Sequence, residues 1–125
     1  IPQGTLAEAI RAGGAGLGGI LTPTGVGTIA AEGREIIEVD GKKYILEKPL
    51  KADFAFIRAT HADKFGNFMS AKSTKTFNYV MAMAAETVVL GTEQLHEVGE
   101  LDADFYHMPG TFVTYIVGGE IKWQI

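Results

Sequence analysis

The sequence predicts an α/β domain, because helical and β-type patterns alternate along it. Apolar residues recur at helical spacing near the start and over residues 77–86, and β-prone runs lie between and after these segments. Of the 125 residues, 46% are hydrophobic and 21% are charged, which is typical of a folded globular chain and excludes intrinsic disorder. We therefore expect residues 1–125 to belong to one domain.

Composition excludes several classes of protein. The absence of cysteine excludes disulfide scaffolds, thiol catalysis and cysteine-ligated zinc. A net charge of −4, from 15 acidic and 11 basic residues, argues against a nucleic-acid partner. No apolar run approaches the roughly 20 residues of a membrane helix, so we expect no membrane partner. A start of the signal-peptide type is also missing, and we expect a cytoplasmic protein, or one of an organelle matrix after processing.

The first expected element is a short helix. Thr5 followed three residues later by Glu8 has the pattern of a capping box, in which each side chain bonds the backbone of the other residue. The apolar spacing that follows predicts a helix to about Ala12, and the pair Gly13-Gly14 is expected to end it.

A glycine-rich stretch follows, over residues 13–28. Nine of the 16 glycines lie in the first 33 residues, and a long irregular segment in a compact domain is usually functional. Its Gly14-x-Gly16-x-x-Gly19 spacing matches the dinucleotide fingerprint, but a helix rather than a strand precedes it, which argues against that function. Two interpretations stay open: a wall whose backbone N–H groups meet an anion, or a loop that needs glycine only to turn.

The rest of the chain is expected to alternate strands and helix. Asp40-Gly41 is a strong signal for a type I′ turn, and it predicts a hairpin between residues 35–39 and 43–47. Further along we expect a largely buried strand at 53–59, a turn at Gly66-Asn67, an amphipathic helix over 77–86, and short strands at 87–90 and 112–117.

No residue pattern indicates a catalytic group or a metal site. The three histidines lie far apart without metal-ligand spacing, so we expect surface or structurally satisfied side chains. Neither serine lies in a Gly-x-Ser-x-Gly motif, which argues against a serine hydrolase. The acids have simpler explanations: a helix cap for Glu8, a turn for Asp40, and a solvated hairpin face for the remaining hairpin acids. The three histidines are His61, His96 and His107, and the two serines are Ser70 and Ser73. The remaining hairpin acids are Glu35, Glu38 and Glu47.

Read in order, the segments resemble a known family. Residues 2–16 read PQGTLAEAIRAGGAG, and residues 22–28 read TPTGVGT. The likeness continues through KYILEKPL (43–50), ADFAFIRA (52–59), DKFGN (63–67), FN (77–78) with MAMAA (81–85), HMPG (107–110) and residues 113–117. Together these resemble the α subunit of family I coenzyme A transferases, of the type acting on acetate, butyrate or acetoacetate, or on succinyl-CoA and 3-oxo acids.

The resemblance implies a three-layer α/β/α CoA-transferase-like (NagB/RpiA-like) fold and a ping-pong transfer of CoA from an acyl-CoA to a carboxylic or 3-oxo acid. A glutamate carries the CoA as a thioester between the two halves of the reaction. In this family that glutamate lies in a Ser-Glu-Asn-Gly motif of the β subunit, and the motif is missing here. We therefore expect a β-subunit partner in a hetero-oligomer, no catalytic residue in this chain, and no tightly bound cofactor, with the coenzyme A thioester as substrate.

The sequence departs from the family pattern at two places. The Gly-Gly-Phe motif that opens an α subunit is missing and the chain begins at Ile1, so the resemblance implies the C-terminal part of the subunit. Thr76 precedes Phe77-Asn78 where relatives often have Asn-Phe-Asn, which weakens any role for that segment.

By resemblance, this chain supplies the wall of a substrate pocket near the partner's glutamate. Gln3, Phe77 and Asn78 are weaker candidates for this wall. Packing at a subunit interface is the alternative role for the region. Two other functions stay open: a non-catalytic subunit-docking fragment, and a subunit of a related CoA-dependent lyase. The expected substrate-binding residues are Gly13, Gly14, Gly16, Thr22, Pro23, Thr24, Gly25 and Gly27.

Overall fold

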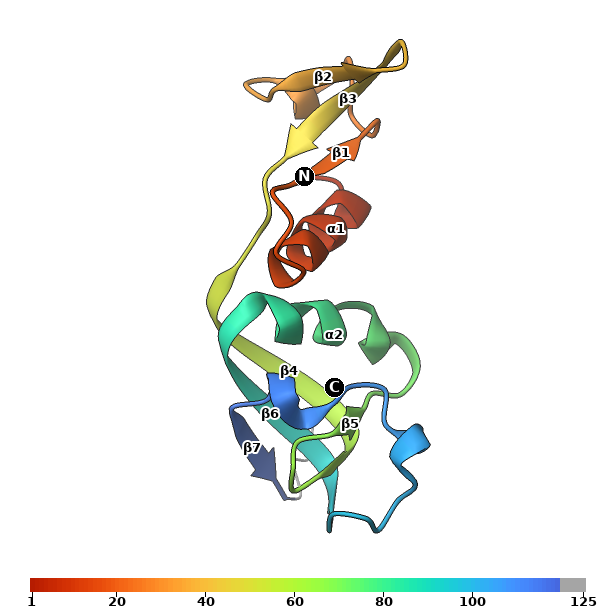
Figure 1. The fold of residues 1–125 in the computed structure, drawn as a ribbon, viewed down its shortest axis with the longest axis vertical. Coiled ribbons are helices and arrows are strands. Elements are labelled where there is room, and N and C mark those ends of the chain that lie inside the picture. Colours follow the sequence, from red (N-terminus) through yellow and green to blue (C-terminus); the bar gives the residue numbers. More distant parts are fainter. Residues whose placement is uncertain (120–125) are drawn as a thin grey trace. The chain divides into compact units, whose positions relative to one another are not determined.

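The computed structural model describes residues 1–119 and forms two compact units (Figure 1). Unit 1 is Ile1–Lys51, and unit 2 begins at Ala52. The mixture of helices with parallel and antiparallel strands confirms the predicted α/β class. The assignment of all 125 residues to one domain stays a prediction. Within the described part, no helix has both the length and the apolar character needed to cross a membrane.

Unit 1 begins with helix α1 (Gln3–Gly14), which starts earlier than the capping box predicted. Pro2 occupies the N-cap position, and no side chain caps the helix. Thr5 is 5% exposed and lies within the helix, on the buried face that it shares with Ala9 and Ala12. The capping box is therefore wrong: Glu8 instead pairs with Arg11. The helix also runs through both glycines to Gly14, two residues beyond its predicted end at about Ala12.

A three-stranded antiparallel sheet completes unit 1, in the order β1-β3-β2. The strands are β1 (Ile20–Thr22), β2 (Ile36–Val39) and β3 (Lys42–Glu47), with a short 3₁₀ helix at Ile29–Ala31. The hairpin is confirmed, because Asp40 and Gly41 have φ of 50° and 78°, as a type I′ turn requires. Residues 13–28 are less irregular than expected, since β1 lies within them and pairs with β3.

Unit 2 contains a four-stranded sheet in the order β5-β4-β6-β7. Strands β4, β6 and β7 are parallel, and β5 is antiparallel to β4. The expected strands at 53–59 and 87–90 are both longer, because β4 and β6 pair along their whole lengths. The strand expected at 112–117 starts later, after a 3₁₀ helix at Gly110–Phe112. The strands are β4 (Ala52–Asp63), β5 (Phe68–Met69), β6 (Ala85–His96) and β7 (Tyr115–Gly118).

Helix α2 (Lys75–Ala84) connects β4 to β6 and confirms the helix predicted from the apolar spacing. The 3₁₀ helices Lys72–Thr74 and Ala103–Phe105 lie in the connections. Met81 and Met83 pack against the core of unit 2, as expected. The turn at Gly66-Asn67 is also confirmed, since the Gly66 N–H donates to the Asp63 carbonyl at 2.9 Å. The core consists of Ala55, Ile57, Ala59, Ala62, Phe68, Ala82, Val88, Leu90 and Met108.

Candidate functional site

The start of α1 and the end of β1 border a cavity of about 650 Å³ in unit 1. Its walls combine the first turn of the helix with the strand and the turn that follows the strand. The volume lies in the range of small-molecule sites. The lining residues are Pro2, Gly4, Thr5, Glu8, Ile20, Leu21, Thr22 and Thr24.

The first turn of α1 offers hydrogen-bond donors to this cavity. The first N–H groups of any α-helix have no acceptor within the helix, and no side chain caps α1. The first backbone bond of the helix runs from the Leu6 N–H to the Pro2 carbonyl at 2.9 Å. The N–H groups before Leu6, together with the helix dipole, therefore favour a negative charge or an oxyanion at this end.

Thr22 adds a side-chain donor. Its hydroxyl oxygen accepts the backbone N–H of Thr24 at 3.2 Å. A hydroxyl has one donor hydrogen in addition to its acceptor lone pairs, so this bond leaves the Thr22 hydrogen able to donate. The turn that holds Thr24 continues through Gly25, whose φ of 93° needs glycine and whose carbonyl accepts the Thr28 hydroxyl at 2.7 Å.

Among the eight residues expected at the site, the cavity brings together Thr22 and Thr24. None of the expected glycines lines the cavity. A Cβ on Gly13 would be 1.9 Å from the Leu50 carbonyl oxygen, so that glycine allows a close approach of two segments. Gly16 and Gly27 have φ of 71° and 77° and serve turns. The remaining expected residues that do not line the cavity are Gly14, Pro23 and Gly25.

The three weaker candidates fall in both units. Gln3 is flanked in sequence by the lining residues Pro2 and Gly4. Phe77 and Asn78 belong to α2 of unit 2. The amide of Asn78 donates to the carbonyls of Arg58 and Thr74, both at 2.8 Å, so it fastens α2 to β4.

Sequence reasoning missed most of the cavity wall. Glycine content drew attention to residues 13–28, whereas Pro2, Gly4 and Glu8 come from the helix before it. The one signal in the sequence that could have located this wall is Pro2. Proline is compatible with the start of a helix, and its side chain has no hydrogen-bond donor or acceptor, so it leaves the helix start without a side-chain cap. The capping-box pattern placed the expected helix start at Thr5 instead, so Pro2 was not considered.

A pair of hydrogen-bonded histidines is the main titratable cluster of unit 2. His61 Nδ1 lies 2.9 Å from His96 Nε2, and His96 Nδ1 lies 3.2 Å from a carboxylate oxygen of Glu100. Burial, aided by the nearby His96, lowers the pKa of His61 below its ordinary value. The histidines are thus structurally satisfied, and His107 likewise bonds the Tyr79 hydroxyl at 2.7 Å. Over residues 1–119 no group of three His, Asp or Glu side chains is arranged to hold a metal ion.

Two further acidic residues, Glu47 and Asp63, form contacts within the fold. Glu47 was expected on a solvated face, but its residue is only 6% exposed and it pairs with Arg34. Asp63 lines a second cavity, of about 710 Å³, and its carboxylate accepts the N–H groups of Phe65 and Asn67 and the Asn67 amide. Those bonds hold the turn after β4, so they assign Asp63 a structural role.

Comparison with known proteins identifies the family. The family model of Coenzyme A transferase matches residues 1–119. The alpha subunit of the acetate CoA-transferase of Escherichia coli K12 is 48% identical over 117 residues, which are 94% of this chain and 53% of that subunit. One subunit of the 3-oxoadipate CoA-transferase of Pseudomonas putida is also 48% identical over 117 residues, covering 94% of this chain and 51% of its own. The chain thus spans about half the length of these relatives.

Solved structures share the fold. The apoenzyme of an acyl-CoA transferase (YdiF) from Escherichia coli O157:H7 matches 95% of this chain and 27% of its own, with a TM-score of 0.84 and 26% identity. Glutaconate coenzyme A-transferase from Acidaminococcus fermentans matches 96% of this chain and 45% of its own, with a TM-score of 0.85. At 17% identity the second match shows the fold alone. The resemblance drawn from the sequence is confirmed, and the chain belongs to the coenzyme A transferase family.

Proposed function

We propose that this chain works as part of the α subunit of a CoA-transferase, together with a β-subunit partner. The family match supports the transferase class. Relatives at about the same identity are single subunits of enzymes for acetate, 3-oxoadipate, and succinyl-CoA with 3-ketoacids. The proposed substrates are therefore a short-chain acyl-CoA and a carboxylic or 3-oxo acid.

The proposed reaction has two halves with one carrier. The partner's glutamate attacks the carbonyl of the acyl-CoA thioester, which forms an acyl-glutamyl anhydride and releases the CoA thiolate. This thiolate attacks the glutamyl carbonyl of the anhydride, so the first acid leaves as a carboxylate and the enzyme holds CoA as a glutamyl thioester. The acceptor acid reverses these steps and departs as the new acyl-CoA. Each attack on a carbonyl carbon creates an oxyanion, and hydrogen-bond donors already aimed at that oxygen lower the barrier.

The cavity beside α1 carries the proposal for this chain's own part. Its uncapped helix start and the free hydrogen of the Thr22 hydroxyl are donors suited to a carboxylate or an oxyanion. In this role the chain binds and orients the reacting acid, while the nucleophile belongs to the partner. In the same proposal, the predicted pocket residues outside the lining act through the backbone: Gly16, Gly25 and Gly27 through turns with positive φ, and Gly13 through a close approach to Leu50. Gly14 and Pro23 stay predicted substrate-binding residues.

Reconstitution tests this function. The chain is combined with the remaining half of the α subunit from Escherichia coli and with the matching β subunit. CoA transfer from acetyl-CoA to acetoacetate is followed by the appearance of acetoacetyl-CoA. Thr22→Val should lower kcat at least about 10-fold, as expected for the loss of one oxyanion donor. Thr111→Val, at an exposed position of unit 2, should leave kcat unchanged.

Each contrary result has a defined meaning. Equal rates for Thr22→Val and Thr111→Val would exclude Thr22 from the site. Assembly with the β subunit but no CoA transfer would support a docking fragment. Products of carbon–carbon bond cleavage would indicate a CoA-dependent lyase.

A further inference from the structure

Strand β1 carries one polar and one apolar side chain on the same face. Residues two apart in a strand point to the same side, so Ile20 and Thr22 share a face and Leu21 lies on the other. The register places Ile20 opposite Glu47, which is only 6% exposed. It places Thr22 opposite Ile45, which is 1% exposed. Because directly opposite residues share a face, Ile20 and Thr22 belong to the buried face of the sheet.

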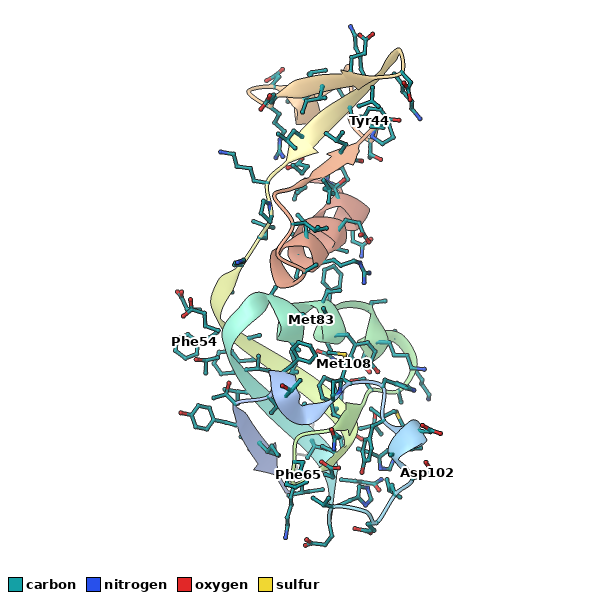
Figure 2. The ribbon with its side chains drawn as sticks, in the orientation of Figure 1. Tyr44, Phe54, Phe65, Met83, Asp102 and Met108 are labelled. Atoms are coloured by element: carbon teal, nitrogen blue, oxygen red, sulfur yellow. The ribbon has the colours of Figure 1, made fainter. Side chains whose placement is uncertain are left out.

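The alternation along β3 agrees with this assignment. Tyr44, labelled on β3 in Figure 2, and Leu46 alternate with the buried residues of that strand. Leu46 lies opposite Leu21 in the register, and Leu21 is 41% exposed. The two faces of the sheet therefore differ in burial, and Ile20 is not on the more exposed one.

Strand β1 is also the edge strand of this sheet that lies beside α1 (Figure 1). The cavity of about 650 Å³ is lined by this strand and by the first two turns of the helix. A strand rises about 3.3 Å per residue, so Ile20 lies about 6–7 Å from Thr22 along β1. An acid whose carboxylate reaches the Thr22 hydroxyl can therefore place its alkyl chain against Ile20.

The helix side of the cavity has free space at Gly4. A Cβ added to Gly4 would meet nothing within 4 Å. Gly4 and Glu8 are four residues apart in α1, so they lie on one helix face, and both line the cavity. Alanine favours a helix more than glycine does, so the helix itself does not require glycine here. The missing side chain leaves room inside the cavity.

We propose that Ile20 and Gly4 form an acyl-length filter, which sets how long an acyl chain the cavity accepts. The inference rests on the proposed function, in which Thr22 and the start of α1 bind the carboxylate or the oxyanion. With that end of the substrate fixed, a straight alkyl chain extends along β1 and ends at Ile20. Gly4 gives the chain its space. The substrate class is a short, unbranched acyl group.

Opposite substitutions at the two positions test the filter in the reconstituted assembly. The quantity measured is kcat/KM for acetyl-CoA, butyryl-CoA and hexanoyl-CoA with one acceptor acid. Ile20→Ala lengthens the apolar space, so the ratio of hexanoyl-CoA to butyryl-CoA should rise at least about 10-fold, the effect of one methylene in an apolar pocket. Gly4→Leu fills the free space, so the ratio of butyryl-CoA to acetyl-CoA should fall at least about 10-fold.

Ile36→Ala is the matched control for the loss of an isoleucine side chain. Ile36 belongs to β2 of the same sheet, is 42% exposed and does not line the cavity. Both substrate ratios should therefore stay as in the wild type.

A binding measurement tests the filter without CoA chemistry. Butyrate and hexanoate are mixed with the same assembly, and saturation-transfer NMR records the signal of each acid. Ile20→Ala should raise the hexanoate signal relative to the butyrate signal, and Ile36→Ala should leave this relation unchanged.

The outcomes separate the filter from the proposed function. CoA transfer with the same substrate ratios in Ile20→Ala and Ile36→Ala would overturn the filter alone. A Gly4→Leu variant that lowers kcat/KM equally for all three thioesters would also overturn it. An assembly that transfers no CoA would contradict the proposed function. In that case a raised hexanoate signal in Ile20→Ala would still support the filter, and an unchanged or absent signal would overturn it.

Discussion

Unit 1 buries three apolar side chains almost completely, Ala9, Ala12 and Ile45, whereas unit 2 gathers nine buried residues in one cluster. The backbone shows the reverse contrast. Six glycines of unit 1 have positive φ, against three in the described part of unit 2. The two units therefore depend on different features: unit 2 on side-chain packing, and unit 1 on glycines that permit turns and a close approach of the backbone. Unit 2 should be sensitive to the removal of atoms, and unit 1 to their addition.

Truncation of the unit 2 core should have the largest effect on stability. Phe68 is fully buried in the core cluster, and Phe68→Ala should lower the free energy of unfolding by about 3–5 kcal/mol. Phe54→Ala, at 62% exposure, should change the free chain by less than about 0.5 kcal/mol. Urea unfolding followed by circular dichroism measures both variants. Similar losses for the two would contradict a packing-based account of unit 2.

Addition of a single methyl group should have the next largest effect, and in unit 1. Gly13→Ala would place its Cβ 1.9 Å from the Leu50 carbonyl oxygen, and the required backbone shift should cost about 2–3 kcal/mol. Gly4→Ala in the same helix is the control, since nothing lies within 4 Å of its added Cβ. That variant should be neutral or up to about 1 kcal/mol more stable, because alanine favours a helix. A neutral Gly13→Ala would show that unit 1 tolerates displacement of Leu50.

The smallest effect should be a pH dependence confined to unit 2. Burial lowers the pKa of His61 below 6.5, so the unfolded chain binds a proton there more readily than the folded chain. The stability of unit 2 should therefore fall as the pH is lowered through 6.5. Amide exchange of β4 and β6 between pH 7.5 and 5.5 measures this slope, and exchange in β3 of unit 1 provides the reference.

His61→Gln is the decisive variant for that slope. It removes the titrating ring but keeps a polar side chain beside His96, so the pH dependence in β4 and β6 should flatten. Hydrogen bonds from the Glu97 backbone and His96 lower the pKa of Glu100 from 4.5. Glu100 therefore binds its proton below pH 5.5, outside the range of the measurement. An unchanged slope in His61→Gln would assign the dependence to another group.

Local signals in the sequence predicted the local parts of the fold. Asp40-Gly41 alone sets a turn, and the apolar spacing of residues 77–84 sets a helix, because each depends on neighbours in sequence. The lengths of β4 and β6 depend on pairing between segments more than 30 residues apart, which no local pattern reveals. The expected burial of residues 53–59 was half wrong: Phe54 and Phe56 are apolar, yet they face away from the core.

The lining of the candidate cavity was predictable only in part for the same reason. Thr22 and Thr24 came from the family resemblance, and the cavity includes both. The opposite wall, from Pro2 to Glu8, depends on how α1 packs beside β1. The Arg34–Glu47 pair and the His61–His96 pair join residues 13 and 35 positions apart, so composition and spacing could not show them.

The Asp40-Gly41 turn has a practical consequence for labelling experiments. Both residues are exposed, and a side chain at Gly41 would meet nothing within 4 Å. Neither Asp40 nor Gly41 lines the cavity beside α1. Exposed loop tips of this kind accept insertions well. A short peptide tag or a fluorophore inserted between Asp40 and Gly41 would therefore label the chain at a position outside the cavity lining.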